Sequence, residues 1–223
     1  MRLSIVVPVL NEAAGLQATL QALQALRAGG HELIVVDGGS HDDSAALAAT
    51  LADQVVHSPR GRARQMNAGA ARARHDTLLF LHADTRLPAA ADAAIAQALQ
   101  GGARWGRFDV RIEGRSAWLP VVAWFMNRRS RLSGIATGDQ ALFVQRALFQ
   151  QLGGFPEQPL MEDVELSRRL RAQSRPACLR ARVVTSGRRW DERGAWRTIV
   201  LMWRLRWLYW RGTPAEQLAR AYR

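Results

Sequence analysis

The sequence has one cysteine, Cys178, and no lysine. A single cysteine excludes a disulfide framework and a cysteine-rich metal site, and it gives no reason to expect an oxidising compartment. All 31 basic residues are arginine, and with 19 acidic residues they give a net charge of +12. Arginine without lysine, among many alanines, is typical of a GC-rich genome. We also find no nucleic-acid-binding motif, so no nucleic-acid partner is expected.

Long hydrophobic runs are also missing. The first apolar run, residues 3–10, is followed at once by Asn11 and Glu12, which makes it too short for a signal peptide or a membrane span. Cytoplasmic residence is therefore expected. A length of 223 residues, 48% of them hydrophobic, suits one sizeable domain with a real core.

Apolar segments alternate with alanine-rich segments through the first hundred residues. They predict strands at 3–9, 32–37, 54–57 and 77–83, and helices near 12–27, 42–52, 62–74 and 89–100, the last started by Pro88. This alternation is typical of an α/β domain with a mostly parallel central sheet flanked by helices. Later segments predict an exposed or edge strand at 105–113, a short strand at 141–145, a helix from 146 ended by two glycines, and a helix at 161–173.

The end of the chain has a different composition. Residues 196–211 are WRTIVLMWRLRWLYWR, in which Arg197, Arg204 and Arg211 recur every seven residues. The spacing predicts a basic amphipathic helix, within a tail of residues 196–223 that follows a domain of residues 1–195. Such a helix can pack on its own domain, form a homodimer, or lie peripherally on the inner face of a membrane. Residues 118–126, WLPVVAWFM, are a second candidate for that surface.

Polar residues stand where the predicted strands end. His82 and Asp84 follow the apolar run 78–81, and alternation places them on one side of the extended backbone. A carboxylate and an imidazole at the carboxyl end of a buried strand suit Mg²⁺ or Mn²⁺. A plain strand end with a capping aspartate is the alternative.

Two other strand ends carry polar loops. In PVLNE, residues 8–12, Asn11 can cap the next helix and leave backbone amides free for an anion or a base edge. In DGGSHDDS, residues 37–44, the carboxylate of Asp37 can accept hydrogen bonds from a nucleobase or ribose. Both loops can equally be simple helix caps.

Charged residues mark the starts of two predicted helices. Arg60 and Arg64 lie near the start of the helix at 62–74, where guanidinium groups and free amides favour phosphate. Glu162 and Asp163 open the helix at 161–173. Acids there complement the helix dipole, and one of them can also serve as a general base that activates an acceptor hydroxyl.

In chain order, the segments PVLNE, DGGS, LHAD, GGF and ED resemble the motifs of the inverting family 2 glycosyltransferases, which have the GT-A fold. The resemblance runs from about residue 3 to residue 172. TSGRRW and the tail are similar to a small bacterial branch often labelled for arsenosugar biosynthesis. The resemblance implies a single GT-A domain that transfers a sugar from a nucleotide-sugar, expected to be a UDP-sugar, to a hydroxyl acceptor with inversion.

The resemblance also implies a role for each matching position. Asp84 matches the last acid of the metal-binding DxD motif and would coordinate Mg²⁺ or Mn²⁺, while His82 stands where the first acid is common. Asp163 would deprotonate the acceptor hydroxyl. The nucleotide-sugar would be held by Pro8, Asn11, Glu12, Asp37 and Ser40, together with Arg60, Arg64, His82 and Asp84. The sugar and acceptor pocket would include Asp139, Gly153, Gly154, Phe155, Glu162, Arg189 and Trp190.

Two other functions fit parts of the sequence. A sugar nucleotidyltransferase also uses a nucleotide-binding sheet, but the acidic PVLNE stands where such enzymes carry a glycine-rich basic loop. A non-catalytic module that binds a membrane surface or nucleic acid through the tail would work without Asp84 and Asp163.

Overall fold

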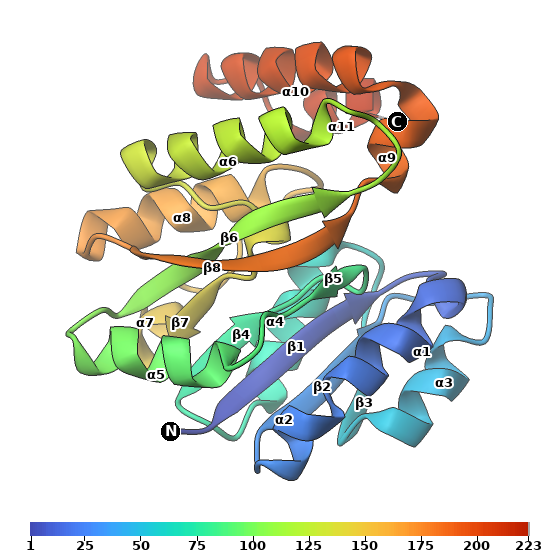
Figure 1. Cartoon of the computed structure of the whole chain (residues 1–223), viewed down its shortest axis with the longest axis vertical. Coiled ribbons are helices and arrows are strands. Elements are labelled where there is room, and N and C mark those ends of the chain that lie inside the picture. The colour runs from blue at the N-terminus through green and yellow to red at the C-terminus, as the bar shows by residue number, and fades with distance from the viewer. Residues whose placement is uncertain (223) are drawn as a thin grey trace.

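Eight strands form one mixed sheet in the computed structural model, which describes residues 1–222 apart from the side chains of Arg193 and Ala195 (Figure 1). The order across the sheet is β3-β2-β1-β4-β7-β6-β8-β5. The strands are β1 (Leu3–Val9), β2 (Glu32–Asp37), β3 (Gln54–His57), β4 (Thr77–Phe80), β5 (Thr85–Arg86), β6 (Trp105–Glu113), β7 (Phe143–Gln145) and β8 (Ala177–Ser186).

Helices connect and cover these strands. They are α1 (Ala13–Ala22), α2 (Gln24–Ala28), α3 (Ser44–Leu51), α4 (Arg62–Arg72), α5 (Ala91–Gln100), α6 (Leu119–Ser133), α7 (Arg146–Gln151), α8 (Glu162–Gln173), α9 (Arg188–Arg193), α10 (Ala195–Trp210) and α11 (Ala215–Tyr222), with a 3₁₀ turn η1 (Gly138–Gln140). The helix predicted at 12–27 is two helices joined at Leu23. Pro88 does not start the helix that follows β4, because β5 forms there first.

The half of the sheet made by β3, β2, β1 and β4 is entirely parallel. In the other half, β7 is antiparallel to both β4 and β6, and β5 is antiparallel to β8. β6 and β8 are parallel to each other, so four of the seven strand pairs are parallel and the prediction of a mostly parallel sheet is confirmed, with β7 and β5 as the antiparallel strands. The prediction of an edge position for β6 is wrong, since β6 lies between β7 and β8 and its first four residues are buried.

Alternating side chains of the parallel strands enter two cores. Ile5 and Val7 pack on one face of the sheet with α1, α5 and α6, whereas Val6 packs on the other face with α4, α7 and α8. α4 approaches the sheet closely at Gly69, where an added Cβ would lie 2.5 Å from Cγ1 of Val6 and 2.8 Å from Cγ2 of Val36. Burial on both faces explains why these strands are continuously apolar.

The chain ends in three helices beside α6 (Figure 1). Leu205 of α10 and Leu218 of α11 form a small core with Leu160 and Met161, which precede α8. Within the described residues, no helix combines the length and apolar character that crossing a bilayer requires.

The contact at Gly69 makes a prediction about stability. Gly69→Ala should lower the free energy of unfolding by about 1–3 kcal/mol, because the new methyl group overpacks two strands. Gly15→Ala is the matched control, since Gly15 is also helical and has nothing within 4 Å of its Cβ position. That control should be neutral or stabilising by up to about 1 kcal/mol in urea unfolding. Equal destabilisation by both substitutions would contradict the close packing.

Candidate active site

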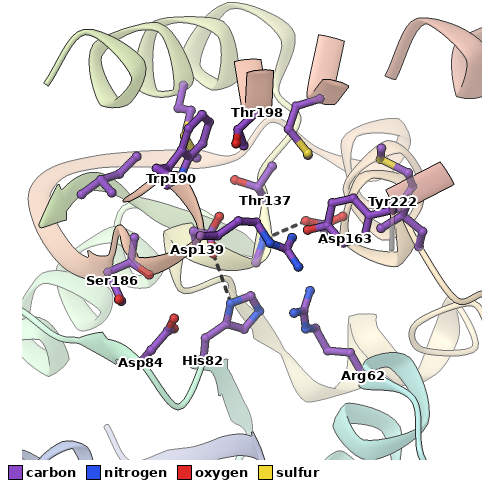
Figure 2. Close-up of a pocket in the computed structure, with 18 of the residues that line it drawn as sticks. Arg62, His82, Asp84, Thr137, Asp139, Asp163, Ser186, Trp190, Thr198 and Tyr222 are labelled. Atoms are coloured by element: carbon purple, nitrogen blue, oxygen red, sulfur yellow. Dashed lines mark hydrogen bonds and ion pairs between the residues drawn. The ribbon is translucent and has the colours of Figure 1, made fainter. Parts of the chain in front are cut away.

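A cavity of about 1400 Å³ opens at the carboxyl ends of β1 and β4 (Figure 2). Segments far apart in the chain line it: the loops after β1 and β4, the end of β8, the turn η1, the start of α8, and the helices α6, α9 and α10. Asp84 and Asp163 both line this cavity. In the view of Figure 2, His82 and Asp139 lie between them.

Asp84 sits in a turn that is clamped by strand pairing. The Thr85 amide donates to the carbonyl of His82 at 3.0 Å, and the Ser186 amide donates to the carbonyl of Asp84 at 3.2 Å. The hydroxyls of Thr85 and Thr185 are 2.9 Å apart across the β5–β8 pair. These contacts fix the backbone while the side chain of Asp84 remains exposed toward the cavity.

His82 and Asp139 meet across the floor of the cavity. Nδ1 of His82 lies 3.3 Å from Oδ1 of Asp139. Burial opposes ionisation of Asp139, but the hydrogen bond and charge of His82, with the charges of Arg62 and Arg189, hold the pKa of Asp139 below its usual value. Nε2 of His82 is buried without a hydrogen-bond partner and faces Gly138, where an added Cβ would lie 2.3 Å away. Only glycine fits this position.

Asp163 and Glu162 begin α8, as the sequence predicts, and both line the cavity. Oδ2 of Asp163 accepts the Gly138 amide at 2.8 Å, which ties α8 to η1. Glu162 is buried beside Arg62, with Oε1 and Nη1 3.6 Å apart. Burial raises the pKa of Glu162, the Asp163 carboxylate adds to the shift, and the Arg62 guanidinium opposes it.

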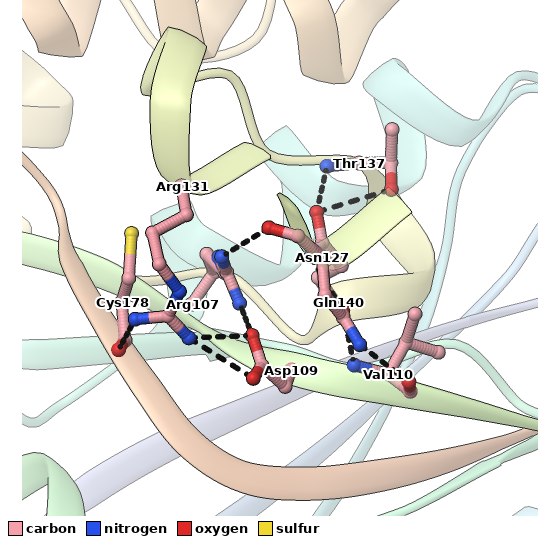
Figure 3. Close-up of polar contacts among 8 residues, drawn as sticks. All are labelled: Arg107, Asp109, Val110, Asn127, Arg131, Thr137, Gln140 and Cys178. Carbon is pink, nitrogen blue, oxygen red and sulfur yellow. Dashed lines mark hydrogen bonds and ion pairs between the residues drawn. The ribbon is translucent and has the colours of Figure 1, made fainter. Parts of the chain in front are cut away.

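A buried amide network holds η1 in place (Figure 3). Oε1 of Gln140 accepts the Thr137 amide at 3.1 Å, and Nε2 of Gln140 donates to Oδ1 of Asn127 at 3.4 Å. Asn127 in turn pairs with both backbone groups of Val110 on β6, at 2.8 and 2.9 Å. The turn that carries Asp139 is thus fastened to α6 and β6.

Two arginines fasten α6 to the strands beneath it. Arg107, which is fully buried, and Arg131 both pair with Asp109 on β6. Arg131 also donates to the carbonyl of Cys178 on β8 at 2.9 Å (Figure 3). Arg107 reaches α6 by donating to the carbonyl of Asn127 at 3.2 Å, so α6 is tied to β6 and β8 by Arg107, Arg131 and Asn127.

The loops predicted to bind the nucleotide lie together at the ends of β1 and β2. The Asn11 amide donates to Oγ of Ser40 at 2.9 Å, and Oδ1 of Asn11 accepts the His41 amide at 2.8 Å. Asp37 is buried and accepts the amides of Gly39 and Ser40. Burial opposes ionisation of Asp37, but these hydrogen bonds outweigh it and lower its pKa.

The structure brings most of the predicted site residues to the cavity. Those that line it are Pro8, Glu12, Arg60, His82, Asp84, Asp139, Glu162, Asp163, Arg189 and Trp190. Asn11, Asp37 and Ser40 stand in the loops beside it. Arg64 does not line it and instead pairs with the exposed Glu157 at 3.1 Å.

The GGF segment is also placed elsewhere. Phe155 is buried in an aromatic cluster, with ring centroids 4.9 Å from Phe80 and 5.6 Å from Phe149. Gly154 is buried beside Asn67, whose side chain pairs with the backbone of Phe155. None of Gly153, Gly154 and Phe155 lines the large cavity, so this part of the predicted sugar and acceptor pocket is corrected to a core contact that stops α7.

Several lining residues were not selected from the sequence, among them Arg62, Gly138 and Arg129. Arg62 is the first residue of α4 and faces the acids, whereas Arg64 faces away, a distinction of helical phase that an arginine-rich segment does not reveal. Gly138 and Arg129 occupy segments without a recognisable motif. Gly138 follows α6 and precedes Asp139. This local pattern indicates a functional position only when the spatial neighbour of Gly138, His82, is known.

A divalent cation has one well-placed donor here. Asp84 offers an exposed, rigidly held carboxylate, and Mg²⁺ commonly binds one or two carboxylates together with substrate phosphates. The described residues contain no cluster of three or more histidine, cysteine or acidic side chains that could enclose an ion alone. The donor set therefore fits a cation shared with a diphosphate, not a closed protein site.

The comparisons with known proteins agree with this fold. Residues 4–149 match the family model described as glycosyl transferase family 2, which is more than half of the chain. This protein belongs to glycosyl transferase family 2 and has the GT-A fold, as predicted. The narrower arsenosugar label stays a prediction.

Individual relatives are more distant. A curated relative from Mycobacterium tuberculosis, described as a PGL/p-HBAD biosynthesis glycosyltransferase, is 37% identical over 91 residues, which is 38% of this chain and 36% of the relative. The chain thus matches little more than a third of that protein. In the solved structures, S. aureus TarS (residues 1–349) has a TM-score of 0.68 at 17% identity, covering 83% of this chain and 60% of TarS. The mannosyltransferase PcManGT from Pyrobaculum calidifontis has a TM-score of 0.67 at 20% identity, covering 92% and 60%.

We expect the effect of the Arg62–Glu162 pair on the free energy of unfolding to depend on pH. The pKa of Glu162 is raised in the folded protein, so its contribution to stability is present at low pH and is lost as pH rises through the folded pKa. Arg62→Ala removes the opposing charge, raises that pKa further and leaves a buried carboxylate unpaired. Unfolding experiments should therefore show a loss on the order of 1–3 kcal/mol at pH 8 and a smaller loss at pH 5.

The control is the double variant Arg62→Ala/Glu162→Gln. Its neutral amide cannot ionise, so most of the difference between pH 5 and pH 8 should disappear. A pH-independent loss in Arg62→Ala would show that the arginine stabilises the fold by packing alone.

Proposed function

We propose that the enzyme transfers a sugar from a nucleoside diphosphate sugar, a UDP-sugar, to an acceptor hydroxyl, with inversion at the anomeric carbon. The observation that carries this proposal is that Asp84 and Asp163 line one cavity, with His82 and Asp139 between them in the view of Figure 2. One carboxylate is exposed on a clamped turn and suits a diphosphate-bound cation. The other begins a helix and suits a hydroxyl group.

Several structural neighbours were solved with nucleotide donors or products. TarS was solved with UDP-GlcNAc and with UDP, and PcManGT with GDP-Man and Mn²⁺. A glucosyl-3-phosphoglycerate synthase from Mycobacterium tuberculosis was solved with Mg²⁺ and UDP. These complexes support a nucleotide-sugar donor and a divalent cation for this chain, which has the same fold.

We assign the donor to the loops after β1, β2 and β4. Asn11 and Asp37 organise adjoining loops whose remaining backbone groups can meet a base and ribose. Arg60 and Arg62, at the start of α4, line the cavity and can face phosphate oxygens. Asp84 would hold Mg²⁺ or Mn²⁺ against the diphosphate, and such an ion neutralises charge on the leaving group when it is bound.

We assign the proton transfer to Asp163. The Gly138 amide holds one carboxylate oxygen at 2.8 Å and so fixes the direction of the side chain. In a single displacement, the acceptor oxygen bonds to the anomeric carbon as the bond to the diphosphate oxygen breaks. The hydroxyl proton passes to Asp163, and the diphosphate leaves with the electron pair. One in-line attack inverts the anomeric configuration.

Asp163→Asn tests the base. Asparagine keeps the size and can still accept the Gly138 amide, but it cannot take a proton at neutral pH. We expect kcat to fall by about 10²- to 10⁴-fold with little change in the KM of the donor. Release of UDP from UDP-sugars, with acceptor or by slow hydrolysis, measures both constants. Asp76→Asn is the matched control, because the Asp76 side chain is 99% exposed. A raised donor KM with unchanged kcat would reject Asp163 as the base.

Asp84→Ala tests the cation site. In the wild type, UDP with Mn²⁺ should raise Tm, and a hundredfold excess of ligand over Kd corresponds to about 2.7 kcal/mol of added stability. The gain should be small with UDP alone, and Asp84→Ala should lose the part that depends on Mn²⁺. The same Tm shift in the variant would place the cation on other residues.

A further inference from the structure

The cavity continues beyond the catalytic residues into an apolar groove between α6 and α10. α6 contributes Val121, Val122, Phe125 and Met126, and α10 contributes Ile199, Val200, Met202, Trp203 and Trp207. The two helices lie side by side in Figure 1, and their apolar side chains line one continuous space with Asp163. The groove therefore leads directly to the proposed base.

The rim of this groove leaves large apolar side chains in water. Exposed fractions are 53% for Phe125, 52% for Val200 and 69% for Trp203. Trp118, which precedes α6 and also lines the cavity, is 56% exposed. A contiguous apolar surface of this kind is typical of a site that binds an apolar ligand or partner.

The charge around the groove has one sign. Neither α6 nor α10 contains an acidic residue, and their lining arginines are Arg129, Arg204 and Arg206. Of the acidic residues in the described part of the chain that line the cavity, only Glu192 lies in the segment that leads into α10. The other acidic lining residues belong to the strand-end loops, η1 and α8. Basic residues beside an apolar groove complement an anionic amphiphile.

Arg129 supplies a second, independent observation. Its Nε and Nη2 atoms are buried without a hydrogen-bond partner, although the residue lines the cavity near Asp163. Burial lowers the pKa of Arg129, the Asp163 carboxylate opposes this shift, and the Arg107 guanidinium adds to it. Two buried guanidinium nitrogens without a hydrogen-bond partner are costly unless a ligand completes their hydrogen bonds.

We infer that the acceptor is an anionic lipid-like amphiphile. Its hydrocarbon part would lie in the groove between α6 and α10, and its anionic group would pair with Arg129, which would bring a head-group hydroxyl to Asp163. Naming this occupant as the acceptor rests on the proposed glycosyl transfer, whereas the binding site itself does not.

Binding of two small probes tests the groove. Lauroyl lysophosphatidic acid, kept below its critical micelle concentration, and glycerol 3-phosphate share an anionic head and differ in the hydrocarbon chain. Titration of the full chain should give at least hundredfold tighter binding of the lipid, since each buried methylene group adds about 0.8 kcal/mol. Equal affinities would overturn the proposal.

Two tryptophans of α10 form a matched pair of variants. Trp203 lines the groove, whereas Trp210 is 80% exposed and does not line it. Trp203→Ala should weaken lipid binding at least fivefold, and Trp210→Ala by less than twofold. Val200→Glu, at another exposed lining position, should repeat the loss. Melting curves would verify that each variant folds. Similar effects of Trp203→Ala and Trp210→Ala would reject the groove as the binding site.

Arg129→Gln tests the anionic group. The substitution should weaken the binding of lauroyl lysophosphatidic acid at least tenfold. It should change the binding of the uncharged dodecyl maltoside by less than twofold, because only the first probe carries a charge that can pair with Arg129. Equal losses for both probes would overturn the role of Arg129.

The oligomeric state, measured by sedimentation, and the binding of UDP distinguish the remaining outcomes. A stable dimer in solution that Val200→Glu dissociates would assign the groove to a second copy of the chain and overturn the proposal. Lipid binding without any UDP binding would refute the glycosyl-transfer proposal alone, and UDP binding without lipid binding would refute the amphiphile alone.

Discussion

Three segments far apart in the sequence meet at Gly138. Its amide binds Asp163 at the start of α8, and its Cα faces the imidazole of His82 at the end of β4. A side chain at this position would occupy the space of Nε2 of His82, only 2.3 Å from an added Cβ. The relative placement of the proposed base and the proposed cation-binding turn therefore depends on the absence of a single side chain.

The two halves of the sheet contribute differently to the cavity. The parallel half ends in the loops of Asn11 and Asp37 and in the turn of Asp84, which strand pairing and backbone hydrogen bonds hold rigidly. The other half supports η1 and α6 through the side chains of Asn127, which is half-buried, and Gln140, which is buried. The proposed nucleotide site therefore lies on the regular half of the sheet, and the proposed acceptor site lies on the irregular half.

The sequence predicts the parallel half well because its strands are buried on both faces. Residues 5–9 and 33–36 are continuous apolar runs, and the predicted bounds 3–9 and 32–37 agree with β1 and β2. The position of β6 is missed because its visible alternation, at Arg111 and Glu113, belongs to the end that extends past the core. Pairing with β7 over residues 105 and 106 is a tertiary contact that no local pattern reports.

The site residues also divide into those that the sequence predicts and those that only the packing reveals. Asp84 and Asp163 stand at element boundaries that the sequence marks clearly, and both face the cavity. Arg64 was chosen over Arg62 because neighbouring arginines at a helix start look alike until the helical phase is known. GGF was assigned to the pocket by resemblance, but its phenylalanine completes a cluster with Phe80 and Phe149. Local rules locate loops, while packing decides which side chains enter the cavity.

The tail is built into the site as well as into the fold. Leu205 and Leu218 share a core with Leu160 and Met161, the residues that lead into Asp163. Thr198 is buried and lines the cavity, so α10 contributes polar as well as apolar surface to it. A boundary near residue 195 therefore divides the sequence by composition but cuts through a shared core. The same helix therefore supports the start of α8 and forms one wall of the groove.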